Sequence, residues 1–248
     1  MTQSSARRVG DAIAIDGGYQ YKALTEGNAV QRFWHRNKQI VIDRYLPPRE
    51  TDRVIDVGCG SGVISSFLAT SGASVIGIDA NESAIEFAQR HFLSQNLKFR
   101  RGLVEEAFSE DEIFDKIYCL ELIEHLQYEQ GLGLLKTFRR FLVPDGSVLL
   151  TTPNYRSPWP VIEWLMDALK LAPRMADHQH VAKYHPKTLR RLCEQAGFDA
   201  QVVVTTCFAA PWLAPLSWQV ALMVNRLETG RRILPGCIVV CVLRKRDR

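Results

Sequence analysis

One segment, from Val54 to Gly62, constrains the fold of this chain more than any other. It reads Val-Ile-Asp-Val-Gly-Cys-Gly-Ser-Gly, so a short apolar run leads directly into a turn that contains three glycines. A helical pattern of apolar residues begins at Val63, and a second apolar run, residues 75–78, ends at Asp79. This succession of strand, tight turn, helix, strand and acidic residue is typical of a site for an adenosine-containing cofactor at the carboxyl edge of a parallel sheet.

Details of the turn indicate which kind of cofactor would bind. The dinucleotide fingerprint has its third glycine three residues after the second, whereas Gly58, Gly60 and Gly62 have the spacing Gly-x-Gly-x-Gly. Asp56 precedes the first glycine by two residues, and its carboxylate would repel a pyrophosphate but attract an ammonium group. S-adenosylmethionine carries an ammonium and a sulfonium and has no phosphate. The carboxylate of Asp79 could accept hydrogen bonds from both ribose hydroxyls.

On these residues the sequence resembles the class I S-adenosylmethionine-dependent methyltransferases. Residues 56–62 match the glycine-rich motif of that family, and Asp79 matches its ribose-binding acid. The resemblance covers about residues 50–205 and, loosely, the last strand. Leu103 departs from it, because family members often have an acidic or polar residue there, so the adenine would be contacted by backbone amides, by Leu103 and Val104, or by Glu105. The implied site for S-adenosylmethionine and its product S-adenosylhomocysteine consists of Asp56, Gly58, Cys59, Gly60, Gly62, Asp79, Ala80, Leu103, Val104, Cys119 and Leu120.

Apolar runs and helical patterns alternate along the chain in the manner of a doubly wound α/β fold. Helices are expected to start near Ser61, Asn81 and Tyr128, between strands at residues 53–57, 74–78, 97–100, 116–119 and 147–152. Two further β-rich runs, residues 199–206 and 236–243, form an antiparallel pair in the fold that the chain resembles. The expected fold class is therefore α/β, with a Rossmann-like, seven-stranded, mostly parallel sheet, an antiparallel last strand and added helical lid segments.

The chain is long enough for one substantial core, since it has 248 residues and 46% apolar content. A helix is expected from Ala29, capped by Asn28, to Tyr45, where Pro47 and Pro48 end it. We therefore expect a single methyltransferase domain over residues 1–248. Its expected parts are a flexible terminus over residues 1–20 and an N-terminal helical cap over residues 21–48. A cofactor-binding half over residues 49–152 and a substrate half with its lid over residues 153–248 follow.

Composition argues against several classes of protein. The net charge of +4 arises mainly near the two ends of the chain, and no basic stripe alternates with aromatic residues, so we expect no nucleic-acid partner. The six cysteines lack the close pairs of a metal site, which favours reduced cysteines and a cytoplasmic location. No window reaches about 18 consecutive apolar residues, so a membrane span is not expected. The oligomeric state is left open.

A cluster of acidic residues and histidine follows the fourth expected strand. Glu121, Glu124 and His125 are spaced i, i+3 and i+4, so on a helical turn their side chains project from one face. The segment resembles that of the ubiquinone-biosynthesis O-methyltransferases, in which this constellation has been linked to a divalent cation. Such an ion could hold a catechol-like substrate and lower its hydroxyl pKa. Alternatively, Glu121 caps local backbone and Glu124 faces solvent.

A second cluster precedes the helix that Pro186 begins. Residues 177–185 contain three histidines and Tyr184, and they resemble the approach to that helix in many small-molecule methyltransferases. His180 or Tyr184 could then point into the cleft, and a histidine of near-neutral pKa suits removal of a hydroxyl proton. His125 is a third candidate for this role. The alternative is that the three histidines lie in a solvated loop.

Two segments of the substrate half exceed the minimal fold, residues 154–185 and residues 208–227, and both are rich in tryptophan. Their tryptophans suit a hydrophobic pocket, although they could simply form core: Trp159, Trp164, Trp212 and Trp218. We therefore expect O-methylation of a small, lipophilic, phenol-like or quinol-like acceptor by in-line displacement, as in quinone biosynthesis. One alternative is an RNA or protein methyltransferase, although no Asn-Pro-Pro-Tyr-like motif follows the fourth strand. Another is a protein that binds S-adenosylmethionine for other chemistry or for none.

Residues 208–224 contain no charged residue. Pro211 and Pro215 make the run too interrupted to span a bilayer, but Trp212 and Trp218 suit a membrane interface. We expect this segment to roof the substrate pocket and to make peripheral membrane contact. The alternative is an ordinary buried lid helix.

Overall fold

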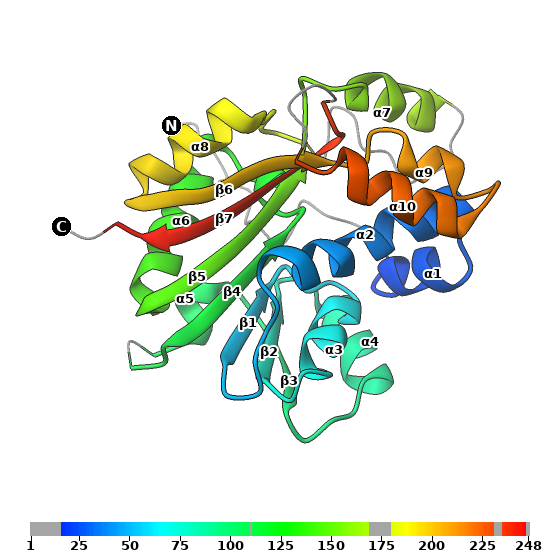
Figure 1. Ribbon diagram of the computed structural model, residues 1–248. Coiled ribbons are helices and arrows are strands. Elements are labelled where there is room, and N and C mark those ends of the chain that lie inside the picture. Colours follow the sequence, from blue (N-terminus) through cyan, green and yellow to red (C-terminus); the bar gives the residue numbers. More distant parts are fainter. Residues whose placement is uncertain (1–15, 110, 169–179, 231–234, 247–248) are drawn as a thin grey trace, which may run out of the picture.

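The computed structural model describes residues 16–109, 111–168, 180–230 and 235–246. Within them, seven strands form one sheet in the order β3-β2-β1-β4-β5-β7-β6 (Figure 1). The parallel pairs join β1 to β2 and β4, β2 to β3, and β4 to β5, whereas β7 is antiparallel to both β5 and β6. The expected fold class is confirmed. The strands are β1 (Arg53–Val57), β2 (Ser74–Asp79), β3 (Leu97–Arg101), β4 (Phe114–Leu120), β5 (Leu142–Pro153), β6 (Phe198–Thr206) and β7 (Ile238–Lys245).

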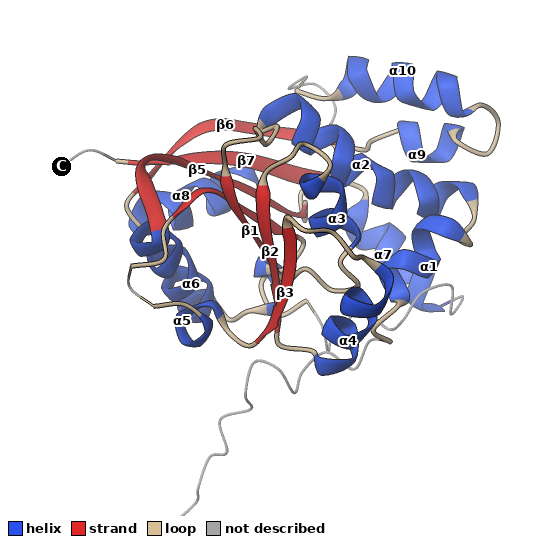
Figure 2. Cartoon of the chain, turned by 90° about the horizontal axis from the view of Figure 1, so that it is seen from below, coloured by secondary structure: helices blue, strands red, loops and turns tan. Residues whose placement is uncertain are grey.

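Helices cover both faces of the sheet (Figure 2). One face packs against α2 (Ala29–Tyr45), α3 (Val63–Ala69) and α10 (Trp218–Glu228), and the other packs against α6 (Tyr128–Phe141) and α8 (Pro186–Gln195). The remaining helices are α1 (Tyr19–Thr25), α4 (Glu82–His91), α5 (Val104–Ala107), α7 (Trp159–Ala168), α9 (Ala210–Leu213) and the short 3-10 turn η2 (Ile123–His125).

The central strands are apolar on both sides because each side meets a helical layer. In β4, Ile117 and Cys119 belong to the core beneath α6 and α8, whereas Tyr118 and Leu120 belong to the core beneath α2 and α3. Strand β7 alternates between the two cores in the same way. This two-sided burial explains why these strands read as continuous apolar runs in the sequence.

Local signals set the ends of several helices. Asn28 and Gln31 form a reciprocal capping box at the start of α2, and Asn81 caps α4. Helix α8 begins at Pro186, and Gly197, just beyond its end, has φ of +86°, a conformation that favours glycine. These helix limits agree with the sequence expectation.

Elsewhere the elements differ from that expectation. Strands β4 and β5 are longer than predicted, because beyond an irregularity in the register Phe114 pairs with Leu142. Helix α1 begins at Tyr19, inside the stretch expected to be flexible, of which residues 1–15 lie outside the described part. Helix α7 is described as far as Ala168, and the apolar run from residue 208 forms two helices, α9 and α10. No helix in the described residues is long and apolar enough to cross a bilayer.

A buried polar network attaches α10 to the rest of the fold. The Thr206 hydroxyl of β6 donates to Asn225 Oδ1 at 3.0 Å, and Asn225 Nδ2 donates to Asn37 Oδ1 of α2 at 2.9 Å. The buried carboxylate of Glu228 accepts hydrogen bonds from the backbone N–H groups of Phe208 and Ala209, at 2.8 and 2.9 Å. Because these groups satisfy one another, the lid formed by α9 and α10 has a defined position over the sheet.

Candidate active site

The glycine-rich loop joins β1 to α3 at the carboxyl edge of the sheet. Asp79, at the end of β2, accepts from the Gly60 N–H at 2.8 Å through Oδ2 and from the Asn81 N–H at 2.8 Å through Oδ1. Gly58, Gly60 and Gly62 all have positive φ, between 50° and 81°, which L side chains rarely adopt. The acid and the loop predicted from the sequence therefore form one hydrogen-bonded unit.

Gly62 and Gly60 serve different purposes. A Cβ on Gly62 would lie 2.8 Å from Ala88 Cβ and from the Phe99 ring, so this glycine permits close packing of α3 on its neighbours. A Cβ on Gly60 would lie 2.8 Å from the side chain of Gln20 in α1, across the cavity surface. Gly60 is thus the position where the backbone itself borders the space for a ligand.

A cavity of about 860 Å³ extends from this loop. Its first end is bordered by Gly58, Gly60, Asp79, Ala80, Leu103 and Val104, all of which were predicted as cofactor residues. Its other end is bordered by aromatic and polar side chains: Trp34, Trp159, Trp212, Glu121, Glu124, His125 and His180. One cavity therefore joins the expected cofactor residues to the candidates for chemistry.

The structure does not bring the remaining predicted cofactor residues to the cavity. Asp56 is 2% exposed and accepts a hydrogen bond from the Ser65 hydroxyl of α3 at 2.7 Å. Burial raises its pKa to about 6, against the lowering effect of that hydrogen bond. Asp56 therefore supports the loop from beneath instead of facing a ligand ammonium. Three other predicted cofactor residues are buried and do not border the cavity: Cys59, Cys119 and Leu120.

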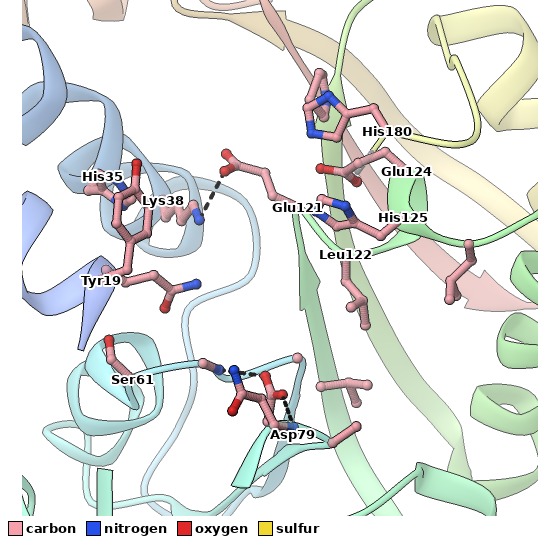
Figure 3. A pocket seen from close by; sticks show the side chains of 18 of the residues that line it. Tyr19, His35, Lys38, Ser61, Asp79, Glu121, Leu122, Glu124, His125 and His180 are labelled. Carbon is pink, nitrogen blue, oxygen red and sulfur yellow. Dashed lines mark hydrogen bonds and ion pairs between the residues drawn. The ribbon is translucent and has the colours of Figure 1, made fainter. Parts of the chain in front are cut away.

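Glu121 forms an ion pair that the sequence did not indicate. Its Oε2 lies 3.0 Å from Nζ of Lys38 in α2 (Figure 3), and the Lys38 side chain is only 7% exposed. Glu121 has φ of +57°, and its Oε1 is buried without a hydrogen-bond partner among the described residues. A strained backbone with an unsatisfied oxygen is characteristic of a functional site. Lys38 also faces the cavity.

A different set of three residues meets the geometry of a metal site. One ligand atom each of Glu124, His125 and His180 lies within 4.8 Å of the other two. Glu121 was predicted as a member of the set, but its carboxylate pairs with Lys38 instead. The third member is His180, which comes from a distant segment of the chain (Figure 3). Burial raises the pKa of Glu124 to about 7, although the charge of His180 opposes this. The Thr152 hydroxyl donates to Glu124 at 3.0 Å.

His180 is held from behind by two residues that sequence reasoning missed. Its Nδ1 lies 2.5 Å from Glu163 Oε1 and 3.0 Å from the Tyr155 hydroxyl oxygen. The Tyr155 hydroxyl donates to the Glu163 carboxylate, whose two oxygens both lie 3.0 Å from it. Burial lowers the pKa of His180, but the hydrogen bond to Glu163 and the charges of Glu124, Glu163 and Glu121 raise it overall. No local motif could have pointed to this contact, because α7 and the His180 loop meet only in the folded chain.

Tyr184, predicted as a catalytic candidate, lies elsewhere. It is 3% exposed and packs in the core beneath α6 and α8, close to Gly131. Its backbone carbonyl accepts a hydrogen bond from the Tyr155 N–H at 2.8 Å, so the residue stabilises the loop that carries His180. Burial raises the pKa of its hydroxyl beyond the range of a useful base.

Aromatic side chains from three separate segments form the wall near His180. Trp34 of α2 and Trp159 of α7 are 4.9 Å apart between ring centroids, and the rings of His125 and His180 are 5.0 Å apart. Trp212 of α9 also borders the cavity. This end of the cavity suits a flat, largely apolar molecule with a polar group directed at the histidines.

Comparisons with known proteins agree with this geometry. The family described as "Methyltransferase domain" matches residues 30–203. The ubiquinone biosynthesis O-methyltransferase of Nitrosospira multiformis is 32% identical over 195 residues, which cover 76% of this chain and 77% of that protein. Two solved structures have the same fold: a possible histamine N-methyltransferase from Thermotoga maritima (TM-score 0.66, 20% identity, covering 92% of this chain and 94% of that one) and an S-adenosylmethionine-dependent methyltransferase from Archaeoglobus fulgidus (TM-score 0.62, 22% identity, covering 92% and 99%).

Proposed function

We infer that this chain, which belongs to the methyltransferase-domain family and is an S-adenosylmethionine-dependent methyltransferase, methylates a hydroxyl group of a small, lipophilic, phenol-like or quinol-like acceptor. The observation that carries the proposal is the single cavity that leads from the Gly60–Asp79 unit to an aromatic wall with two histidines. The cofactor supplies the methyl group on its sulfonium. A relative named for O-methylation in ubiquinone biosynthesis supports the same class of acceptor.

The residues then have distinct roles. Gly58 and Gly60 allow the cofactor to approach the backbone, and Asp79 accepts hydrogen bonds from it. Trp34 and Trp159 hold the acceptor ring. When no metal ion is bound to the two histidines, His125 or His180 accepts the hydroxyl proton. Leu103 and Val104 provide apolar contact for the adenine, as the sequence suggested.

The proposal predicts formation of S-adenosylhomocysteine when the purified protein is given S-adenosylmethionine and a catechol or quinol with an apolar substituent. The product should be the O-methyl ether, identified by mass spectrometry. Matched acceptors with the hydroxyl already methylated serve as controls and should be inert. Turnover with RNA or protein acceptors, and none with the phenols, would support the alternative class instead.

We also propose that a divalent cation binds to Glu124, His125 and His180. Two imidazoles and one carboxylate fit Zn²⁺, Mn²⁺ or Fe²⁺ better than Mg²⁺, which prefers oxygen ligands. Burial raises the pKa of the Glu124 carboxyl to about 7, and a cation bound beside it would favour the ionised form that acts as a ligand. The ion would lower the hydroxyl pKa of a bound acceptor.

Chelation should therefore depress turnover, and Mn²⁺ or Zn²⁺ should restore it more effectively than Mg²⁺. Calorimetric titration of each ion into the metal-free protein tests the ligand set directly. Glu124→Gln should abolish binding, whereas Glu121→Gln should leave the affinity close to that of the wild type. Loss of binding in Glu121→Gln would favour the set predicted from the sequence, and full activity in chelator would remove the metal.

Beside the cavity, α7, α9, α10 and the turn before α10 expose apolar side chains. We propose that these side chains form a surface that contacts a membrane containing the acceptor. Its exposed members are Val161, Trp164, Leu165, Trp212, Leu216, Val220, Met223 and Leu227. The three helices lie on the same side of the molecule (Figure 1). Trp212 both belongs to this surface and borders the cavity, so an acceptor dissolved in the bilayer could enter there.

Flotation with vesicles that contain anionic lipid tests this surface. At low salt the wild type should float with the vesicles, and the double variant Leu216→Glu/Met223→Glu should remain at the bottom of the gradient. Leu93→Glu is the matched control, since Leu93 is 88% exposed and lies between α4 and β3. A wild type that stays wholly unbound would contradict membrane contact.

A further inference from the structure

Glu163 is a buried carboxylate in an unusual position. It belongs to α7, and its side chain is 8% exposed, as is that of His180. Its contacts in the described structure are the His180 ring and the Tyr155 hydroxyl. Burial of a carboxylate is unfavourable unless its oxygens accept hydrogen bonds, so the arrangement of these three groups needs an explanation.

The chemistry of the contacts determines the form of the histidine. The Tyr155 hydroxyl donates to Glu163, and an ionised carboxylate has no proton to donate. With Glu163 as the carboxylate, the short contact between its Oε1 and His180 Nδ1 requires that Nδ1 carries the hydrogen. In the neutral ring the other nitrogen, Nε2, then has the free lone pair.

His180 presents its ring to the cluster with Glu124 and His125 at the cavity (Figure 3). The ring nitrogen that Glu163 does not engage is the one available for a ligand there. We propose that Glu163 is a positioning residue, which holds His180 as the Nδ1–H tautomer so that Nε2 can bind a metal ion or accept the proton of an acceptor hydroxyl. The role of Nε2 in this inference rests on the proposed function. The tautomer does not, because it follows from the contacts of Glu163 alone.

The same helix joins this role to the acceptor pocket. Trp159 and Ile162, which border the cavity, precede Glu163 in α7. The wall that contacts the acceptor and the carboxylate that orients His180 are thus parts of one short helix. Tyr155 shares the carboxylate and limits its rotation, so Tyr155→Phe should weaken the arrangement without removing it.

Nitrogen-15 NMR of the histidine-labelled chain tests the tautomer without any acceptor. A two-bond proton–nitrogen spectrum, recorded at a pH where the ring is neutral, distinguishes Nδ1–H from Nε2–H, and His180→Gln identifies the resonance. We expect Nδ1–H in the wild type and in Glu163→Gln, because the amide oxygen can still accept the hydrogen bond. In Glu163→Leu the ring should shift to the Nε2–H form or to a mixture.

Turnover provides the second measurement. Glu163→Leu should lower kcat about 10–100-fold, the effect typical of a residue that orients a ligand from behind, and Glu163→Gln should recover most of it. The dissociation constant for S-adenosylmethionine should stay within about twofold of the wild type in both. Glu86→Leu, which removes an exposed carboxylate of α4, is the control for the substitution itself.

The outcomes separate this inference from the proposed function. An Nε2–H ring in the wild type, or an unchanged Nδ1–H ring in Glu163→Leu, would overturn the positioning role. Equal losses of kcat in Glu163→Gln and Glu163→Leu would do so as well. Failure of every phenolic acceptor would instead contradict the proposed function and leave the NMR result standing.

Discussion

Replacement of Lys38 by methionine should lower the free energy of unfolding by about 3 kcal/mol or more, the effect measured when one member of a buried ion pair is removed. Lys38 Nζ lies 3.0 Å from Glu121, and the two side chains are 7% and 18% exposed. Methionine fills similar space but leaves the Glu121 carboxylate without its counter-charge. Urea denaturation of the ligand-free protein, followed by circular dichroism, measures the change.

Two variants show whether the loss comes from the stranded charge. Lys38→Met/Glu121→Gln removes the charge that the single substitution strands, so much of the stability should return. Lys22→Met removes a lysine from the exposed pair with Asp16 and should have a far smaller effect, since exposed pairs contribute little. If Lys38→Met and Lys22→Met were equally stable, the pair would not have the importance that its burial implies.

Asp79→Ala should raise the dissociation constant for S-adenosylmethionine about 10–150-fold, which corresponds to about 1.5–3 kcal/mol for loss of a charge-assisted hydrogen bond. Asp79 borders the cavity and also holds the Gly60 and Asn81 amides at 2.8 Å. The substitution therefore removes a ligand contact and loosens the loop at once. Isothermal titration calorimetry measures the affinity.

A nearby acid provides the matched control for this result. Glu82→Ala removes an exposed carboxylate that pairs with Arg101, and the affinity should not change measurably. Asp79→Asn keeps one oxygen acceptor and should fall between the wild type and Asp79→Ala. Wild-type affinity in Asp79→Ala would contradict the assignment of the cofactor site.

The sequence predicted the fold well because its strongest signals are local. The signals include the alternating apolar runs, the cap at Asn28, a helix start near Asn81 and Pro186 at the start of α8. Each depends on neighbours within a few residues, and the structure has these features in place. The glycine-rich loop and Asp79 were predicted together because the separation of two parallel strands in the sequence is nearly constant in this fold.

The candidate site was predicted less completely, because its residues come from distant segments. The helical spacing of Glu121, Glu124 and His125 suggested one ligand set, but a positive φ at Glu121 turns that side chain toward Lys38. His180 completes the cluster from a loop that precedes α8. The apolar residues of α9 and α10 were recognised, but not which of them face solvent.

Local composition and spacing thus determined the strands, the caps and the cofactor loop of this chain, since each requires only backbone conformation and short-range hydrogen bonds. The tertiary structure alone decided which way the polar side chains at the carboxyl edge of the sheet point. Asp56 turns inward to Ser65, Glu121 meets Lys38, and Glu163 meets His180. The physical reason is that a buried polar or charged side chain takes its orientation from the group that hydrogen-bonds or pairs with it. Here that group lies at least nine residues away in the sequence.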